Sequence, residues 1–297
     1  MNVKKILILG CTGMLGHKLC QRYKDRYEVW ATVRASASNY KKYGIFCEDT
    51  IVSGLDISNM DKVIRILCDI RPDVVINCIG VIKQLKSAKD PITTLKINSL
   101  FPHQLANMCQ AVKARMIHIS TDCVFAGTSG MYLESDVSDA IDLYGRTKYL
   151  GEVNYPPALT IRTSIIGREL QTTSGLIEWF LSNRDSTVKG FQKAIYTGFT
   201  TIALADVIAN IIDNHPELAG LYQVSSEPIN KHDLLTLIKE KFGLSCVIEP
   251  ETETCIDRSL DSSRFRQFTG FVPPSWDSMI NQMAEDPTPY DNWRSDT

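Results

Sequence analysis

Short apolar runs alternate with longer segments of helical periodicity through the first half of the chain. Runs rich in Val and Ile are typical of strands buried on both faces of a sheet. They occupy residues 6–9, 28–33, 74–78, 116–119 and 159–162, and the helical patterns between them occupy residues 14–24, 59–70, 92–113 and 143–154. This alternation predicts right-handed crossovers and an α/β fold with a doubly wound parallel sheet.

The pattern after about residue 165 is less regular, with helices expected near 174–183, 203–213 and 231–242 and a short strand near 187–189. No stretch rich in Gly, Ser or Pro separates a second domain, so we expect a smaller C-terminal region interleaved with the first domain. The predicted boundaries are 1–165 for the first domain, to which 198–220 return, and 166–197 with 221–297 for the smaller region. Residues 285–297 are polar and include two prolines, so they are expected to be loosely held.

Composition narrows the class of protein. The chain has 32 Lys and Arg against 34 Asp and Glu, so no strong electrostatic field favours a nucleic-acid partner. No apolar run is long enough to cross a bilayer. The nine cysteines include no Cys-x-x-Cys pair and the five histidines are scattered, so no metal site and no disulfide framework are expected. These features favour a cytoplasmic protein with reduced thiols.

A glycine-rich turn follows the first predicted strand and opens the first predicted helix. Glycines keep such a turn tight and let the backbone approach a pyrophosphate, which the unpaired N–H groups of the helix N-terminus can bind. The spacing alone is weak evidence, because any tight strand-to-helix turn favours glycine. Its position in the alternating pattern favours a dinucleotide site, whose expected contacts are Gly10, Thr12, Gly13, Met14, Leu15 and Gly16.

The end of the second predicted strand indicates which dinucleotide is bound. NAD-dependent proteins commonly place an acid there to accept the ribose 2′-OH. This chain has Arg34 and Ser36 and no acid in residues 31–36. A guanidinium can bind a 2′-phosphate with two hydrogen bonds, so NADP(H) is the predicted cofactor, with a solvated surface arginine as the alternative. Asp56 and Ile57 are expected near the adenine, although a helix-capping role explains Asp56 equally well.

Three residues suggest acid–base chemistry. Thr121 lies just after the strand at 116–119, where ligands of open α/β sheets bind. Tyr144 and Lys148 are four residues apart on a predicted helix and so share one face. An ammonium beside a phenol favours the phenolate and would lower its pKa toward the range of an acid–base catalyst. The Tyr-x-x-x-Lys pattern alone is common by chance, but its combination with the glycine turn and Thr121 is a strong signal.

Five segments carry a resemblance to a known family: the glycines at 10, 13 and 16, Asn-Cys-Ile-Gly at 77–80, Ser-Thr-Asp-Cys-Val-Phe at 120–125, Tyr-Gly-Arg-Thr-Lys at 144–148 and Ile-Arg-Thr-Ser at 161–164. Residues 4–168 resemble the extended short-chain dehydrogenase/reductases, and among these the dTDP-4-dehydrorhamnose reductase group of nucleotide-ketosugar reductases. The resemblance implies a Rossmann fold that binds a nucleotide-linked sugar. A homodimer is a further expectation, although the sequence does not determine the oligomeric state.

The resemblance also implies a role for each matching residue. Tyr144 would protonate the alkoxide that forms when NADPH transfers hydride to a keto group. Lys148 would lower the pKa of that tyrosine and hold the nicotinamide ribose, and Thr121 would hydrogen-bond the substrate oxygen. Further expected cofactor contacts are Cys78, Ile79 and Gly80.

The chain departs from the family pattern on the substrate side. The proline that usually precedes the tyrosine is absent from residues 139–143, and Gly175-Leu176 replaces an Asn-Phe pair. Candidate substrate contacts, besides Thr121, are Asp122, Arg168, Thr200 and Arg258. An ordinary surface role is the alternative for the last three.

Other functions of the same fold stay open. A dehydratase is disfavoured, because Cys123 stands where that chemistry needs a glutamate and a neutral buried thiol is a poor base. An epimerase can use the same Tyr and Lys, although Arg34 argues against its usual tightly bound NAD. A non-catalytic NADP(H)-binding regulatory subunit is the third alternative, since residues alone do not prove turnover.

Overall fold

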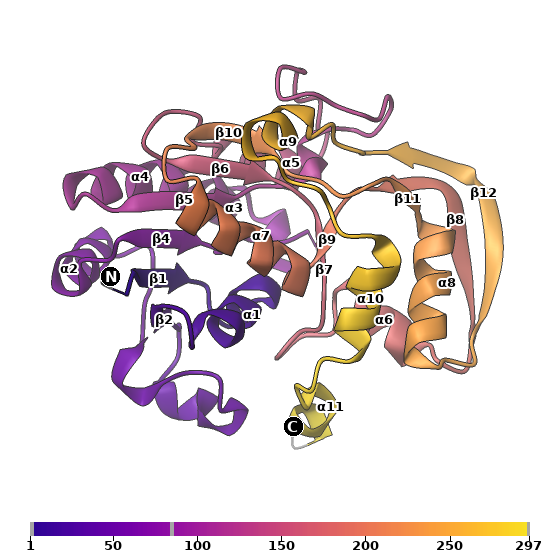
Figure 1. The fold of residues 1–297 in the computed structure, drawn as a ribbon, viewed down its shortest axis with the longest axis horizontal. Helices are drawn as coiled ribbons and strands as arrows, with labels where there is room; N and C mark the ends of the chain where they lie inside the picture. The colour runs from indigo at the N-terminus through magenta and orange to yellow at the C-terminus, as the bar shows by residue number, and fades with distance from the viewer. Residues whose placement is uncertain (1–2, 84–85, 296–297) are drawn as a thin grey trace.

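A seven-stranded parallel sheet forms the centre of the computed structural model, which describes residues 3–83 and 86–295. Its strand order is β10-β6-β5-β4-β1-β2-β3 (Figure 1), which confirms the predicted doubly wound α/β fold. The strands are β1 (Lys5–Leu9), β2 (Glu28–Thr32), β3 (Ile51–Val52), β4 (Val74–Asn77), β5 (Arg115–Ile119), β6 (Leu159–Arg162) and β10 (Gly220–Gln223). Among the described residues, no helix has the length and hydropathy needed to cross a membrane.

Helices cover both faces of this sheet because the inner strands are apolar on both sides. In β1, Ile6 and Ile8 face one hydrophobic core with helices α1 (Met14–Tyr23) and α7 (Thr201–Asn214). Leu7 and Leu9 face a second core with helices α2 (Met60–Ile70) and α4 (Phe101–Ala111). These four apolar side chains of β1 are at most 1% exposed. Burial of both faces is what the uniformly apolar run predicts.

The helix predicted at 92–113 is interrupted. It begins as α3 (Pro91–Thr94), widens into a π-helical segment (Leu95–Leu100) and continues as α4. The wide turn directs Asn98 to Val81, whose backbone N–H donates to Asn98 Oδ1 over 2.8 Å. Such π-turns commonly mark functional positions. The next helix, α5 (Leu143–Leu150), ends four residues before its predicted end at 154.

A smaller three-stranded sheet lies beside the large one (Figure 1). Its strands are β8 (Thr187–Tyr196), β11 (Ile229–Asn230) and β12 (Val247–Asp257). Helix α8 (Lys231–Phe242) packs on β8, and α10 (Trp276–Ala284) packs on α8. The other elements of this half are α6 (Leu176–Ser182), α9 (Ser263–Thr269) and a two-stranded pair of β7 (Ile165–Ile166) with β9 (Phe199–Thr200).

The chain passes between the two sheets more than once. After β8, helix α7 packs against α1 and β10 pairs with β6 in parallel. The following segment then returns to the small sheet through β11. The interleaving expected from the missing linker is therefore present, while the domain boundaries themselves stay a prediction.

The expectation of a loosely held C-terminal end is wrong. Residues 290–295 form helix α11 (Tyr290–Ser295), and Tyr290 is only 3% exposed. Asp286 forms an ion pair with Lys18 of α1 over 2.5 Å. The polar composition of this segment does not signal disorder, because its polar side chains find partners elsewhere in the protein.

Candidate active site

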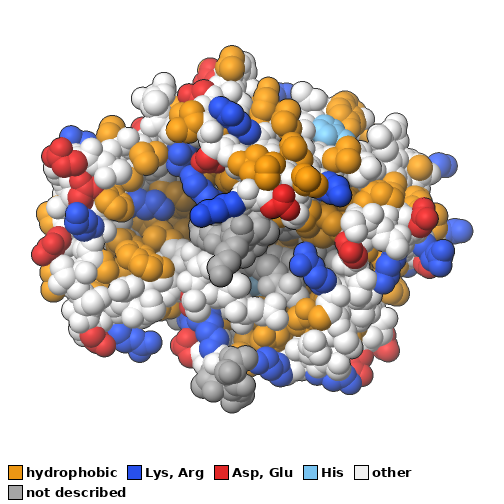
Figure 2. All heavy atoms as spheres, turned by 180° about the vertical axis from the view of Figure 1, so that it is seen from behind, with side chains coloured by type: hydrophobic (Ala, Val, Ile, Leu, Met, Phe, Trp, Pro, Cys, Tyr) orange, Lys and Arg blue, Asp and Glu red, His pale blue; other side chains and the backbone are white. Residues whose placement is uncertain are grey.

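A cleft of about 770 Å³ lies at the carboxyl ends of the parallel strands. Ligands of open α/β sheets bind at this edge. The glycine turn, the residues that follow β4 and β5, and helix α5 form one side of the cleft, while α6, α8 and strands β8 and β12 supply the other. Figure 2 shows a hollow with hydrophobic walls on this face, with Lys and Arg side chains gathered beside it.

The glycine turn has the geometry that a pyrophosphate requires. Gly10 has a φ of +84°, which disfavours any side chain, and a Cβ on Gly16 would lie 2.2 Å from the carbonyl oxygen of Gly10. Helix α1 has no side-chain cap at its N-cap residue Gly13. Its first-turn N–H groups are therefore free of a competing side chain at the end where an anion binds. Thr12, Gly13, Met14 and Leu15 line the cleft. These residues fit a dinucleotide.

Three more of the predicted cofactor contacts follow β4. Cys78, Ile79 and Gly80 line the cleft beside the glycine turn. A Cβ on Gly10 would lie 3.1 Å from the side chain of Ile79, so the two loops are in close contact. Burial raises the pKa of the Cys78 thiol, which keeps it neutral. Cys78 is therefore an uncharged wall of the cleft and not a reactive thiolate.

The residues predicted to hold the far end of the cofactor lie outside the lining of the cleft. Arg34 and Ser36 are exposed just after β2, and the Ser36 hydroxyl lies 3.0 Å from that of Ser38. Asp56 accepts a hydrogen bond from the backbone N–H of Ser58 over 2.9 Å, and this bond is the main cause of its lowered pKa. Ile57 packs partly buried against the second core. The N-cap of α2 is Asn59 and not Asp56.

The structure brings the predicted catalytic residues Thr121, Tyr144 and Lys148 to one wall of the cleft. Thr121 accepts a hydrogen bond from the N–H of Cys123 and donates one to Asp122 Oδ1, both over 3.1 Å. These two bonds fix the Thr121 hydroxyl at the end of β5.

The expected lowering of the tyrosine pKa is not present. Burial raises the pKa of Tyr144 above its usual value, and the hydrogen bond with Thr121 opposes this rise. The ammonium of Lys148 instead donates to the carbonyl oxygen of Ile119 over 2.7 Å. Tyr144 is thus held in its protonated form, which is the form that a general acid requires.

Lys148 is 5% exposed, and its buried environment changes the pKa of its ammonium group. Burial lowers the pKa of Lys148 to about 8, while Glu152 and Cys78 act in the opposite direction. Glu152 belongs to a buried network beneath the site. Its carboxylate accepts bonds from Ser120 Oγ at 2.7 Å, from Arg162 Nε at 2.8 Å and from Arg162 Nη2 at 2.7 Å. This network fixes the ends of β5 and β6 under Thr121.

The predicted substrate contacts divide into two groups. Asp122 and Arg258 line the cleft. Arg168 does not, because it is bound to Glu178 over 2.8 Å and to Asp291 over 2.6 Å. Thr200 is fully buried and caps helix α7 by accepting a hydrogen bond from Ala203. Arg258 is anchored through Nε to the carbonyl oxygen of Phe125 over 2.8 Å.

Several cleft residues were missed by sequence reasoning. Lys231, the first residue of α8, lies with its ammonium 4.5 Å from the ring centre of Tyr196. Burial lowers the pKa of Lys231, whereas the charge of Asp122 raises it. Lys189 and Trp179 also line the cleft. No motif marks these residues, and the sequence offered no signal that β8 and α8 face the catalytic wall. Among the described residues, no cluster of His, Cys, Asp or Glu could hold a metal ion.

A doubly wound sheet with a glycine turn and a Thr, Tyr and Lys wall at its carboxyl edge defines an extended short-chain dehydrogenase/reductase. Residues 4–288 match the family described as the RmlD substrate binding domain. The chain therefore belongs to that family.

Two curated relatives match most of the chain. The dTDP-4-dehydrorhamnose reductase of Escherichia coli K12 is 27% identical over 306 residues, covering 95% of this chain and 97% of the relative. The methionine adenosyltransferase 2 subunit beta of Bos taurus is 23% identical, covering 84% of this chain and 76% of the relative.

Solved structures agree in fold. The hypothetical dTDP-4-dehydrorhamnose reductase of Sulfolobus tokodaii is 28% identical with a TM-score of 0.76, covering 93% of this chain and 99% of that one. The dTDP-4-dehydrorhamnose reductase of Bacillus anthracis, solved in complex with NADP, has a TM-score of 0.78 at 21% identity, covering 95% of this chain and 99% of that one. At that identity the second likeness supports the fold alone.

Proposed function

We propose that this protein is an NADPH-dependent reductase of a keto group, at carbon 4, on a nucleotide-linked deoxysugar used for polysaccharide or glycan synthesis. The observation that carries the proposal is the convergence of Thr121, Tyr144 and Lys148 on one wall of the cleft, which the first turn of α1 also lines. The similarity to dTDP-4-dehydrorhamnose reductases supports a nucleotide-sugar substrate.

NADP(H) is the cofactor. Gly13, Met14 and Leu15 would hold its pyrophosphate, and Arg34 with Ser36 would hold the 2′-phosphate, since no acid follows β2 to accept a 2′-OH. When bound, the nicotinamide supplies a hydride to the keto carbon. Cys78, Ile79 and Gly80 would contact the cofactor where they line the cleft.

Three residues of this chain would carry out the transfer of a proton to the substrate oxygen. Thr121 positions the substrate oxygen through its fixed hydroxyl. Tyr144, held in its protonated form by burial, donates a proton to that oxygen as negative charge develops. Lys148, fixed on the Ile119 carbonyl, places a positive charge beside the reaction and stabilises the phenolate that remains.

The opposite wall would bind the nucleotide part of the substrate. Lys189, Lys231 and Arg258 bring positive charge into the cleft, which suits a diphosphate. Trp179 on α6 is 42% exposed at the edge of the cleft and offers a flat surface to a nucleobase. Asp122, whose pKa is raised by burial, would hydrogen-bond a sugar hydroxyl.

The test is direct. The purified protein is mixed with NADPH and a panel of dTDP-, UDP- and GDP-linked 4-ketosugars, and the nicotinamide absorbance is followed. Loss of absorbance with at least one sugar, and its absence in the Tyr144→Phe variant, is the expected result. NADPH binding without turnover on any sugar would instead favour a non-catalytic regulatory subunit.

Inversion of configuration in the sugar without consumption of NADPH would favour an epimerase.

The nine free cysteines support the cytoplasm as the proposed location, since reduced thiols persist there. A homodimer stays a prediction.

A further inference from the structure

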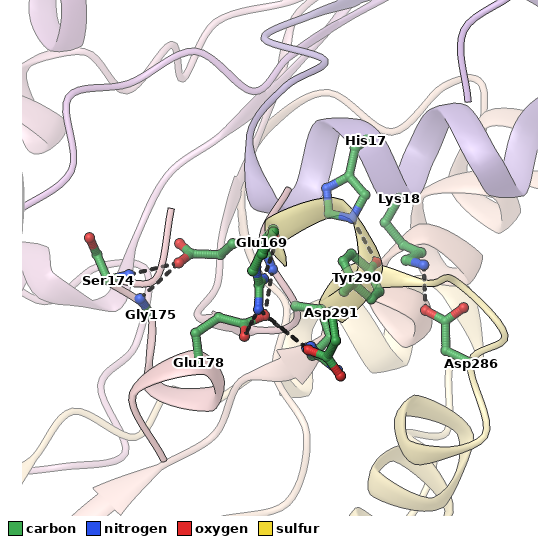
Figure 3. A network of polar contacts seen from close by, with 11 residues as sticks. His17, Lys18, Glu169, Ser174, Gly175, Glu178, Asp286, Tyr290 and Asp291 are labelled. Atoms are coloured by element: carbon green, nitrogen blue, oxygen red, sulfur yellow. Dashed lines mark hydrogen bonds and ion pairs between the residues drawn. The ribbon is translucent and has the colours of Figure 1, made fainter. Parts of the chain in front are cut away.

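The C-terminal segment contacts three parts of the chain, of which two contain residues that line the cleft and the third follows the segment proposed to hold the 2′-phosphate. We call residues 286–294 the C-terminal clasp. Its partners are helix α1 after the glycine turn, the segment 168–178 that leads into α6, and the 3₁₀ helix η1 (Ala37–Tyr43) that follows Ser36. Figure 3 shows the clasp residues Asp286, Tyr290 and Asp291 facing side chains from the first two of these parts. The proposed catalytic residues are not among its partners.

The first contact reaches the glycine turn through a single imidazole ring. The hydroxyl of Tyr290 lies 2.8 Å from His17 Nε2, and His17 Nδ1 lies 2.8 Å from the carbonyl oxygen of Gly13. Because a carbonyl only accepts, Nδ1 must carry the proton and Nε2 must accept from the tyrosine. His17 is fully buried, and burial lowers its pKa to about 4, so the ring stays neutral. The clasp is thus hydrogen-bonded, through His17, to a residue of the proposed pyrophosphate site.

The second contact is with the segment 168–178, which packs against the glycine turn. Arg294 binds the carboxylate of Glu178 and the carbonyl oxygen of Glu169. The Glu169 carboxylate accepts the backbone N–H groups of Ser174 over 2.8 Å and of Gly175 over 3.1 Å (Figure 3). Gly175 in turn lies against the glycine turn, since a Cβ there would be 2.7 Å from Met14 Cε. Glu169, Gly175 and Met14 all line the cleft.

The third contact reaches the segment after β2. The ring of Trp293 packs edge-to-face on Tyr43, with ring centres 5.0 Å apart. Lys42 Nζ donates to the carbonyl oxygen of Trp293 over 3.2 Å. Both partners lie in the last turn of η1, whose N-cap residue is Ser36.

We propose that the C-terminal clasp is a positioning element that sets the affinity for NADP(H), an inference that rests on the proposed function. Three segments distant in sequence must be placed together before the cofactor can contact all of them. Ordering these segments costs free energy when it happens during binding. If the clasp already fixes them in the free protein, binding of the cofactor no longer includes that cost. Reciprocity then requires the bound cofactor to stabilise the clasp by the same factor.

The test uses paired variants and the dissociation constant of NADPH, measured by cofactor fluorescence without any sugar. Tyr290→Phe removes only the hydroxyl bound to His17, and Arg294→Ala removes the bonds to the second segment. Each is expected to raise the dissociation constant by about tenfold, within the usual range of coupling between sites. Arg294→Lys, which keeps the charge, is expected to recover part of this loss. Turnover at saturating NADPH should stay within about twofold of the unmodified protein.

Two matched controls separate positioning from general destabilisation. Tyr155→Phe removes a tyrosine hydroxyl that lies 3.0 Å from His103, away from the cleft. Arg266→Ala breaks an arginine–glutamate pair with Glu227 at 2.7 Å. Both controls should leave the dissociation constant unchanged. A clasp variant that is folded by circular dichroism and binds NADPH within about twofold of the unmodified protein would overturn the proposal.

Hydrogen exchange on the unmodified protein covers the case in which a clasp variant does not fold. NADPH should slow amide exchange in residues 286–294 at least fivefold and leave α9 unaffected; equal rates with and without NADPH would overturn the inference. A protein that binds NADPH but reduces no sugar contradicts only the proposed reductase and leaves this inference testable. A protein that binds no NADPH contradicts both.

Discussion

The ammonium of Lys148 lies 2.7 Å from the carbonyl oxygen of Ile119, the last residue of β5. This bond connects the last turn of helix α5 to the strand that precedes Thr121. Any movement of that strand end would therefore move Thr121 and Lys148 together. The position of Lys148 is therefore fixed by this bond. Whether its positive charge also contributes to activity can be tested by varying the pH.

Activity should fall as the pH rises through about 8. Burial lowers the pKa of Lys148 to about 8, and a lysine carries its charge only below its pKa. The positive charge proposed to stabilise the phenolate is therefore present at neutral pH and lost in alkali. The measurement is kcat/KM for NADPH against pH. In Lys148→Arg, whose guanidinium stays charged, whatever activity remains should lose this alkaline decline.

Tyr144→Phe should lower turnover by a factor of about a hundred to ten thousand, the usual cost of removing a general acid. NADPH binding should stay close to normal, because the phenolic proton matters only as charge develops on the substrate oxygen. Single-turnover rates and NADPH titrations check the two parts separately. Turnover within a few-fold of the unmodified protein would make Tyr144 an ordinary residue of α5.

Arg34→Asp should reverse or abolish the preference for NADPH over NADH. The substitution removes the group that we propose binds the 2′-phosphate and introduces one that would repel it. The ratio of kcat/KM for the two cofactors measures the effect. If the unmodified protein already prefers NADH by tenfold, about 1.4 kcal/mol, the interpretation of the segment after β2 is wrong.

Lys231→Met should raise the KM for the nucleotide-sugar by about tenfold, since a charge-assisted bond contributes roughly 1.5–3 kcal/mol. The NADPH dissociation constant should not change, because Lys231 lies on the wall formed by α8. Lys239→Met in the same helix is the control, since Lys239 does not line the cleft. Equal KM values in the two variants would remove Lys231 from the substrate site.

Arg162→Leu should reduce the free energy of unfolding by about 3–5 kcal/mol, because it leaves the buried carboxylate of Glu152 without its partner. Arg162 is 1% exposed and binds that carboxylate through two nitrogens. Urea denaturation measures the change. Arg22→Leu breaks a half-exposed pair with Asp206 and should cost at most about 1 kcal/mol.

The first half of the fold could be predicted because its inner strands are apolar on both faces and the glycine turn directly follows the first of them. Strand β8 is longer than predicted, since Lys189, Gly190 and Lys193 interrupt its apolar pattern. Strand β12 was not predicted at all. It contains Pro250 and several glutamates, which an edge strand tolerates because one side faces water.

The catalytic wall was predictable for a different reason: Tyr144 and Lys148 lie on one helix and Thr121 just after the neighbouring strand. The opposite wall was not, since Lys231 comes from an element with no motif. The clasp escaped prediction because its partners are remote, with 273 residues separating His17 from Tyr290. Composition cannot reveal such pairs.

The position of β10 limits how this protein can be divided. Strand β6 is buried along its whole length and pairs with β5 on one side and β10 on the other. A fragment that ends at residue 165 would leave the open backbone of β6 facing water, with no α7 to cover the core beside α1. Unpaired apolar strand edges recruit other chains. Such a fragment should aggregate, so the two halves would have to be co-expressed or kept as one gene.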